Sequence, residues 1–150
     1  MTLKKPVFLS VIISLIIASC SRQEVKSPIE GAWQLISIKN MSGDTLIREF
    51  PKTYTGSDII IFSKSHLLSV GRFKQDTIFI DNYVGAKYTL DGNHFEETLL
   101  YFPINERVGQ IVKQILELKN DTLIKSYPCD DSWEIVRSDY YIEKFVRLEQ

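Results

Sequence analysis

Residues 86–95 of the chain read AKYTLDGNHF, which is the pattern of a β-hairpin. Tyr88 and Leu90 alternate with polar residues before Asp91-Gly92, and Phe95 opens a second alternating segment after that pair. Asp-Gly between two alternating segments favours a tight turn, because glycine readily adopts the positive φ that such a turn requires. The central part of the chain is therefore predicted to form antiparallel β-sheet.

Similar strand patterns continue on both sides of this hairpin. We expect strands over 32–38, 58–63, 66–73, 77–90 with a kink near Gly85, 95–102, 110–119, 122–127 and 140–148. Residues 40–57 are expected to form a long connection, and 133–136 either a further strand or an extension of a neighbouring one. Residues 106–118 also fit a helix, but we favour a strand because Asn120-Asp121 then forms a hairpin turn.

Eight short strands in succession favour an up-and-down antiparallel meander. Closing such a meander into a barrel removes its exposed edges and leaves room for one small ligand. We therefore predict an all-β fold with a single eight-stranded barrel over 30–150. The chain has 150 residues, of which 44% are hydrophobic, enough for one such domain. Its net charge of -1 gives no reason to expect nucleic acid as a partner.

The N-terminus has the features of an export signal. Lys4 and Lys5 precede an apolar run over 6–18, which is too short for an ordinary membrane span. The following sequence IASC, at 17–20, resembles the lipobox of bacterial lipoproteins. This resemblance implies a signal peptide over 1–19, acylation of Cys20, a linker over 20–29 and anchoring to a membrane of the bacterial cell envelope. We expect the outer membrane to be the location.

Three stretches together resemble lipocalin-like domain lipoproteins. They are GAW at 31–33, the hairpin at 86–95, and IEKFVRL at 142–148, which resembles the closing strand of that family. The resemblance implies that Trp33 packs at the closed end of the barrel beneath Arg147. Arg137 is the alternative partner for this tryptophan.

The same resemblance implies a ligand inside the barrel. The residues that we expect to line the interior are Phe62, Tyr88, Phe95, Glu97, Leu99 and Tyr101. An inward Glu97 would need a ligand contact or an internal salt bridge, because an unpaired buried charge is costly; otherwise the assumed register of this strand is wrong. We expect a tethered lipoprotein that binds a small apolar ligand. The alternative is a protein–protein interaction module of the envelope, with a fully packed barrel that docks through 40–57 and 129–139.

The sequence contains no pattern that indicates catalysis. GxSxG, HExxH, CxxC and Gly-rich phosphate loops are absent, so we expect neither an enzyme nor a cofactor. A metal site would require His66, His94 and Cys129 to converge, which we do not expect. Asp-Thr-aliphatic triplets at 44–46, 76–78 and 121–123 resemble the O-glycosylation sequon of some exported Bacteroidetes proteins. We favour the simpler explanation, in which Asp ends a turn and the β-branched Thr starts a strand.

Overall fold

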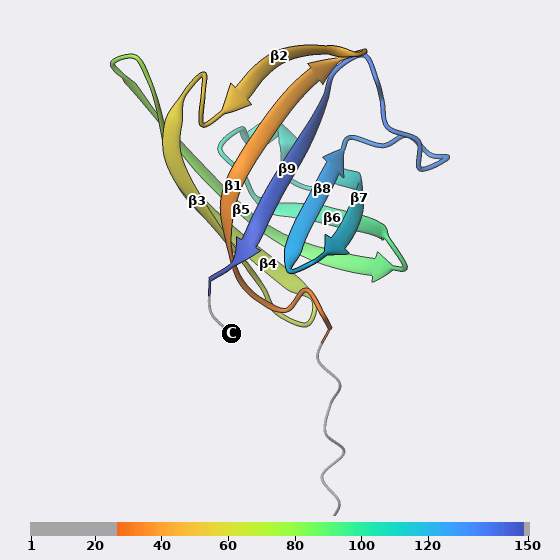
Figure 1. The fold of residues 1–150 in the computed structure, drawn as a ribbon. Helices are drawn as coiled ribbons and strands as arrows, with labels where there is room; N and C mark the ends of the chain where they lie inside the picture. Colours follow the sequence, from red (N-terminus) through yellow and green to blue (C-terminus); the bar gives the residue numbers. More distant parts are fainter. Residues whose placement is uncertain (1–26, 149–150) are drawn as a thin grey trace, which may run out of the picture.

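The computed structural model describes residues 27–148, which form one antiparallel sheet (Figure 1). The strands are β1 (Gly31–Ser42), β2 (Thr45–Phe50), β3 (Thr55–Phe62), β4 (His66–Gln75), β5 (Ile78–Asp91), β6 (His94–Tyr101), β7 (Ile111–Lys119), β8 (Thr122–Tyr127) and β9 (Tyr140–Arg147). A short 3-10 helix, η1 (Asn105–Arg107), lies between β6 and β7. No helix among the described residues is long and apolar enough to span a membrane.

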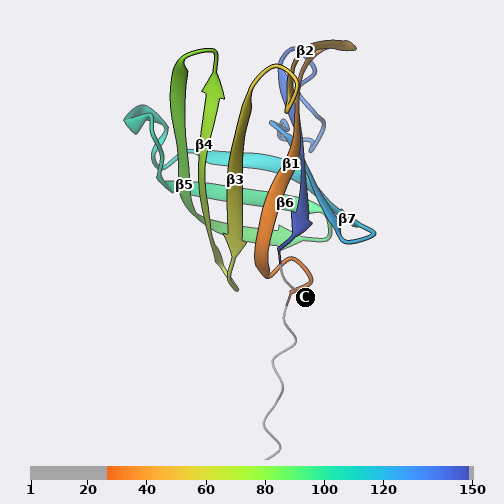
Figure 2. The same cartoon turned by 60° about the vertical axis from the view of Figure 1, so that its left-hand side comes forward.

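Eight of these strands close into a barrel. From β3 to β9 each strand pairs with the next one in the chain, and β1 pairs with β3 on one edge and with β9 on the other. In Figure 2, β3, β4 and β5 run up the view while β6 and β7 cross it, as expected for a sheet that curves round on itself. The predicted all-β, up-and-down, eight-stranded barrel is confirmed.

The ninth strand, β2, was not expected. Residues 40–57 were predicted as a connection, but β1 continues to Ser42 and a turn at Gly43 brings β2 back along it. β3 pairs with only 31–34 of β1, which leaves the far end of that edge free for β2. Figure 1 shows β2 at the end of the barrel opposite the first described residues.

Three other uncertain segments are settled by the structure. β5 is one continuous strand whose register shifts between Gly85 and Ala86, where the kink was predicted. The helical alternative over 106–118 is wrong apart from η1, because β7 occupies most of this segment. Residues 133–136 form no strand and contribute only an isolated bridge between Cys129 and Ile135.

Large apolar side chains fill the end of the barrel at which β1 begins, which we call the closed end. They are Trp33, Phe62, Leu67, Tyr88, Phe95, Leu116, Leu123 and Phe145. Strands alternate in direction, so residues early in one strand and late in the next meet at the same end. The rings of Phe62, Tyr88 and Phe95 pack with centroids 5.1 to 6.0 Å apart, within the range of favourable aromatic contacts.

The Gly-x-Trp motif has a direct physical role at this closed end. Trp33 is completely buried and its indole N–H donates to the carbonyl of Ile29 at 2.8 Å. The Arg147 guanidinium lies 4.2 Å from the indole ring and donates to the carbonyl of Glu30 at 2.8 Å. A Cβ on Gly31, whose φ is +124°, would come 2.8 Å from an Arg147 nitrogen. The motif therefore favours glycine, because other residues rarely adopt this φ and because the arginine lies where a side chain would begin.

The pairing of Trp33 with Arg147 is thus present in the structure. The alternative partner, Arg137, lies at the other end of the barrel and pairs with Asp44 at 3.4 Å.

Candidate functional site

A cavity of about 600 Å³ lies in the barrel between the closed end and the β2 end, which we call the mouth. Pockets of roughly 300 to 1,000 Å³ hold drug-sized ligands. Its walls towards the mouth are largely apolar and include Tyr54, Phe73, Ile80, Phe102 and Ile104. The interior is therefore not fully packed, in contrast to the alternative drawn from the sequence.

The six residues expected to line the interior are placed in three different environments. Glu97 and Leu99 line the cavity. Phe62, Tyr88 and Phe95 lie in the core of the closed end, outside the set of cavity-lining residues.

Tyr101 points outward, and its predicted place in the interior is wrong. Its side chain is 70% exposed. The cause is a register shift, in which Leu99 pairs with Ala86 and Tyr101 with Gly85, so that Leu100 is an extra residue in β6. One extra residue reverses the inward and outward alternation of a strand. The Tyr101 ring consequently lies over Gly85 on the outer face, and Phe102 lines the cavity.

Charged side chains occupy the interior at the middle of four strands. They are Asp58 on β3, Glu97 on β6, Lys125 on β8 and Glu143 on β9, and all four line the cavity. We call this group, together with the neighbouring Gln114 on β7, the polar floor. It separates the aromatic core of the closed end from the apolar mouth.

Asp58 is buried but has a partner for each carboxylate oxygen. The Ser69 hydroxyl donates to one oxygen at 2.7 Å and the Asn82 amide donates to the other at 2.6 Å. Gly71, the partner of Asp58 across the β3–β4 ladder, provides the space, because a Cβ there would come 2.6 Å from the carboxylate. Burial raises the pKa of Asp58, while the two hydrogen bonds act in the opposite direction.

Lys125 and Glu143 form a buried ion pair. The Lys125 ammonium lies 3.6 Å from one Glu143 oxygen, and the Tyr127 hydroxyl donates to the other at 2.6 Å. Burial lowers the pKa of Lys125, but Glu143, Glu97 and Asp58 together raise it by more. The lysine is therefore charged, and its nearest anion is Glu143.

Glu97 and Gln114 are the members of the polar floor whose bonding is incomplete. The Glu97 side chain is buried, with 7% exposed, and Gln114 on the adjacent strand is 1% exposed. Within residues 27–148, neither Glu97 Oε2 nor Gln114 Oε1 has a hydrogen-bond partner. Burial raises the pKa of Glu97, and the nearby Glu143 adds to this, whereas Lys125, a hydrogen bond from Gln114 and the more distant Arg107 lower it.

The mouth carries an aromatic cluster that the sequence analysis missed. Phe50 at the end of β2, Tyr54 just before β3 and Phe73 on β4 have ring centroids 5.5 to 5.7 Å apart. Opposite lies the β6–β7 connection, where the Arg107 guanidinium lies 4.6 Å from the Phe102 ring. No local sequence pattern indicates this cluster, because it depends on β2 folding back along β1.

Lys125 could have been found from the sequence. The segment 122–127 reads TLIKSY, and alternation from an inward Leu123 places Lys125 and Tyr127 on the same face. A lysine at an inward position is the same kind of signal that identified Glu97.

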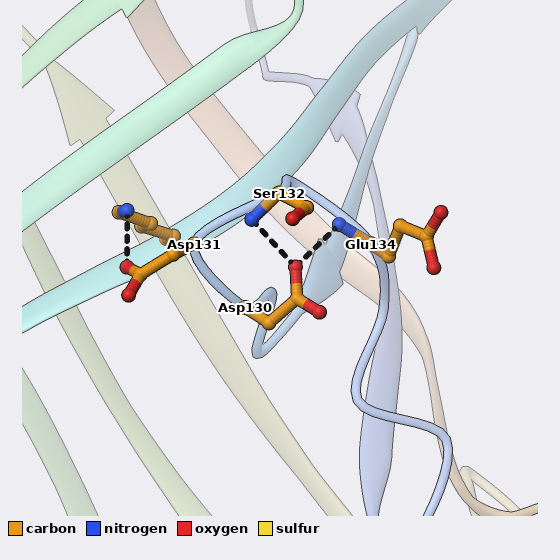
Figure 3. A network of polar contacts seen from close by, with 5 residues as sticks. Asp130, Asp131, Ser132 and Glu134 are labelled. Carbon is orange, nitrogen blue, oxygen red and sulfur yellow. Dashed lines mark hydrogen bonds and ion pairs between the residues drawn. The ribbon is translucent and has the colours of Figure 1, made fainter.

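The segment after β8 forms an ordered strap on the outside of the barrel. The Asp130 carboxylate accepts hydrogen bonds from the backbone N–H groups of Ser132 at 2.8 Å and Glu134 at 3.0 Å, and Lys113 pairs with Asp131 at 2.8 Å (Figure 3). Trp133 stacks on His94 with ring centroids 4.1 Å apart. Asp130 therefore holds the backbone of the strap, and Asp131 joins the strap to β7.

The two segments expected to dock a partner contact each other. The carbonyl of Arg137 accepts a hydrogen bond from the Gly43 N–H at 2.7 Å, and the Asn40 amide donates to Asp139 at 2.6 Å. These bonds join the strap to the β1–β2 turn and stabilise both.

Other residues considered in the sequence analysis do not converge. In the part of the chain that the structure describes, no group of three or more His, Cys, Asp or Glu could hold a metal ion. His66 lies beside the Ser65 hydroxyl at 2.9 Å, and Cys129 is a buried free thiol whose pKa is raised by burial. The signal peptide over 1–19, Cys20 and the linker up to residue 26 lie outside the described residues.

No protein-family model matches the chain, and no curated protein matches it.

Proposed function

We propose that this protein binds a small amphipathic molecule in the cavity of its barrel while a lipid on Cys20 holds it at a membrane of the cell envelope. The observation that carries the proposal is the cavity of about 600 Å³, apolar towards the mouth and polar at its floor. Burying apolar surface contributes about 25 cal/mol per Å², so a ligand that covers these walls gains affinity from them.

The polar floor changes the expected chemistry of the ligand. A wholly apolar molecule over Glu97 would remove water from a buried carboxylate that has an unpartnered oxygen. Such desolvation without a compensating hydrogen bond costs about 1 to 3 kcal/mol or more. A molecule with one polar head and an apolar body matches the floor and the mouth together.

The proposed tether is compatible with access to this cavity. The described chain begins at the closed end, and the mouth lies at the opposite end of the barrel (Figure 1). Attachment through the residues that precede Ser27 therefore leaves the mouth free. Replacing Cys20 by alanine should release the protein from the membrane fraction, and mass spectrometry of the N-terminal peptide should detect acyl chains on the unaltered chain only.

Binding in the cavity can be tested with a fluorescent apolar probe, N-phenyl-naphthylamine. The test uses the chain from residue 21 onward, which contains every strand that closes the barrel. We expect a saturable rise in fluorescence, which Val84→Trp abolishes because Val84 lines the cavity on β5.

The matched control is Tyr83→Trp, which places the same side chain on the outer face, where Tyr83 is exposed. This variant should bind the probe like the unaltered chain. Equal binding by both variants would locate the probe on the outer surface and would contradict the proposal.

A further inference from the structure

We propose that the cavity selects molecules that carry a protonated primary or secondary amine, which donates an N–H hydrogen bond to Glu97 Oε2. This inference rests on the proposed function, because it requires a ligand in the cavity.

The incomplete group that a ligand in the cavity can reach is Glu97, because Glu97 lines the cavity and Gln114 lies outside the set of cavity-lining residues. Glu97 Oε2 and Gln114 Oε1 lie on the neighbouring strands β6 and β7, and neither has a donor among the described residues. Asp58 has Ser69 and Asn82, and Glu143 has Tyr127 and Lys125. When Glu97 is ionised, a ligand that completes its bonding must therefore bring a hydrogen-bond donor.

The charges of the polar floor favour a cationic ligand. The floor holds three carboxylates, Asp58, Glu97 and Glu143, against one ammonium, that of Lys125. Lys125 is paired with Glu143, and Arg107 lies further out against the Phe102 ring. A carboxylate ligand would add a fourth negative charge to this group. An ammonium ligand would instead neutralise a second carboxylate, in addition to the one that Lys125 pairs with.

The needs for a hydrogen-bond donor and for a positive charge together restrict the chemistry of the ligand's head group. A neutral alcohol donates a single hydrogen bond and brings no charge, and a quaternary ammonium brings charge and no N–H donor. A primary ammonium supplies both, with up to three donors. Charge-assisted hydrogen bonds are roughly twice as strong as neutral ones, so the amine should bind best.

A proton competes with the ammonium ligand for the Glu97 carboxylate. Glu97 faces Gln114 from β7, Lys125 from β8, Glu143 from β9 and, further away, Arg107 from the β6–β7 connection. Burial raises its pKa, and an ammonium ligand would favour the ionised form. Binding of an amine should therefore strengthen as the pH rises through the pKa of Glu97.

The experiment compares four molecules with one rigid apolar body: adamantylamine, adamantanol, adamantane carboxylate and trimethyladamantylammonium. Their affinities for the chain from residue 21 onward are measured by isothermal titration calorimetry at neutral pH. We expect the amine to bind about tenfold or more tightly than each of the other three, as one charge-assisted bond to a buried acceptor allows.

Two variants locate the preference at the floor. Glu97→Gln should reduce the affinity for the amine to that for the alcohol and leave the alcohol unchanged. Glu96→Gln, on the outer side of the same strand beside Lys113, is the matched control and should keep the preference. Glu97→Asp shortens the acid by one methylene group and should reduce the preference in part, which gives an independent result if Glu97→Gln does not fold.

The possible results separate this inference from the proposed function. Equal or tighter binding of the carboxylate, or an amine preference that persists in Glu97→Gln, would overturn the amine assignment. If none of the four binds but N-phenyl-naphthylamine binds in a manner that Val84→Trp abolishes, the amine assignment fails and the proposed function stands. If the naphthylamine also fails to bind, both fail.

Discussion

The two halves of the barrel interior are built on opposite principles. At the closed end the interior is aromatic and apolar, and the polar atom that must be buried, the Trp33 indole N–H, has its acceptor. Beyond the closed end the interior holds charges, open volume and, at Glu97 Oε2, an acceptor without a partner in the described chain. The difference indicates that the closed end supplies stability, which allows the other half to keep groups that cost stability and that, in our proposal, serve binding.

The largest effect should come from the closed end. Trp33→Ala removes a completely buried indole and should lower the free energy of unfolding by about 3 to 5 kcal/mol. Tyr54→Ala, which removes a half-buried ring at the mouth, should cost less than half as much. Urea denaturation followed by circular dichroism measures both. Equal losses would mean that stability is not concentrated at the closed end.

The second effect concerns the cost of the polar floor. Because burial raises the pKa of Glu97, the folded protein binds that proton more tightly than the unfolded chain does. The unaltered protein should therefore lose stability relative to Glu97→Gln as the pH rises from the ordinary carboxyl pKa of 4.5 through the raised value. Above that window Glu97→Gln should be more stable by about 1 to 3 kcal/mol.

Unfolding by urea at a series of pH values measures this difference. Glu96→Gln is the control for losing a carboxylate from the outer side of the same strand, and it should not reproduce the rise. If the stability advantage of Glu97→Gln over the unaltered protein shrank as the pH rose, the fold would stabilise the Glu97 carboxylate. The conclusion that the polar floor costs stability would then be wrong.

A third and smaller effect tests how the closed end is sealed. Arg147→Lys keeps the charge but loses the planar group that lies over Trp33 and donates to the carbonyls of Glu30 and Pro28. We expect a loss of about 0.5 to 2 kcal/mol, measured as a shift in the urea midpoint. Lys144→Met, an exposed position on the same strand, should have almost no effect. If Arg147→Lys left the stability unchanged, the planar guanidinium would not contribute to holding Trp33.

The sequence was sufficient for the barrel because its evidence is local and repeated. Alternation in 95–99 and 122–127, with turns at Asp91-Gly92 and Asn120-Asp121, defines neighbouring strands, and Gly31 with Trp33 marks where the barrel closes. Glu97 stands out as an acid at an inward position. β2 could not be predicted, because its pairing depends on how little of β1 is used by β3.

The extent of the cavity could not be predicted from the sequence either. Phe62, Tyr88 and Phe95 alternate inward as predicted, but whether they line a cavity or fill the core depends on their height in the barrel. That height is set by the stagger between strands, which alternation does not encode. The position of Tyr101 was missed for a similar reason, since one extra residue at Leu100 reverses the pattern without any local sequence signal.

The smallest effect tests which of two adjacent residues at this bulge, Tyr101 or Phe102, faces the cavity. Phe102→Ala removes a ring from the cavity wall and should weaken binding of N-phenyl-naphthylamine about five- to tenfold, which corresponds to roughly 1 kcal/mol of apolar contact. Tyr101→Ala removes a similar ring from the outer face, where it is 70% exposed, and should leave the affinity unchanged. Fluorescence titration of both variants measures the contrast between these adjacent residues. If Tyr101→Ala weakened binding and Phe102→Ala did not, the alternation of β6 would continue without the bulge, and the mouth would have a different wall.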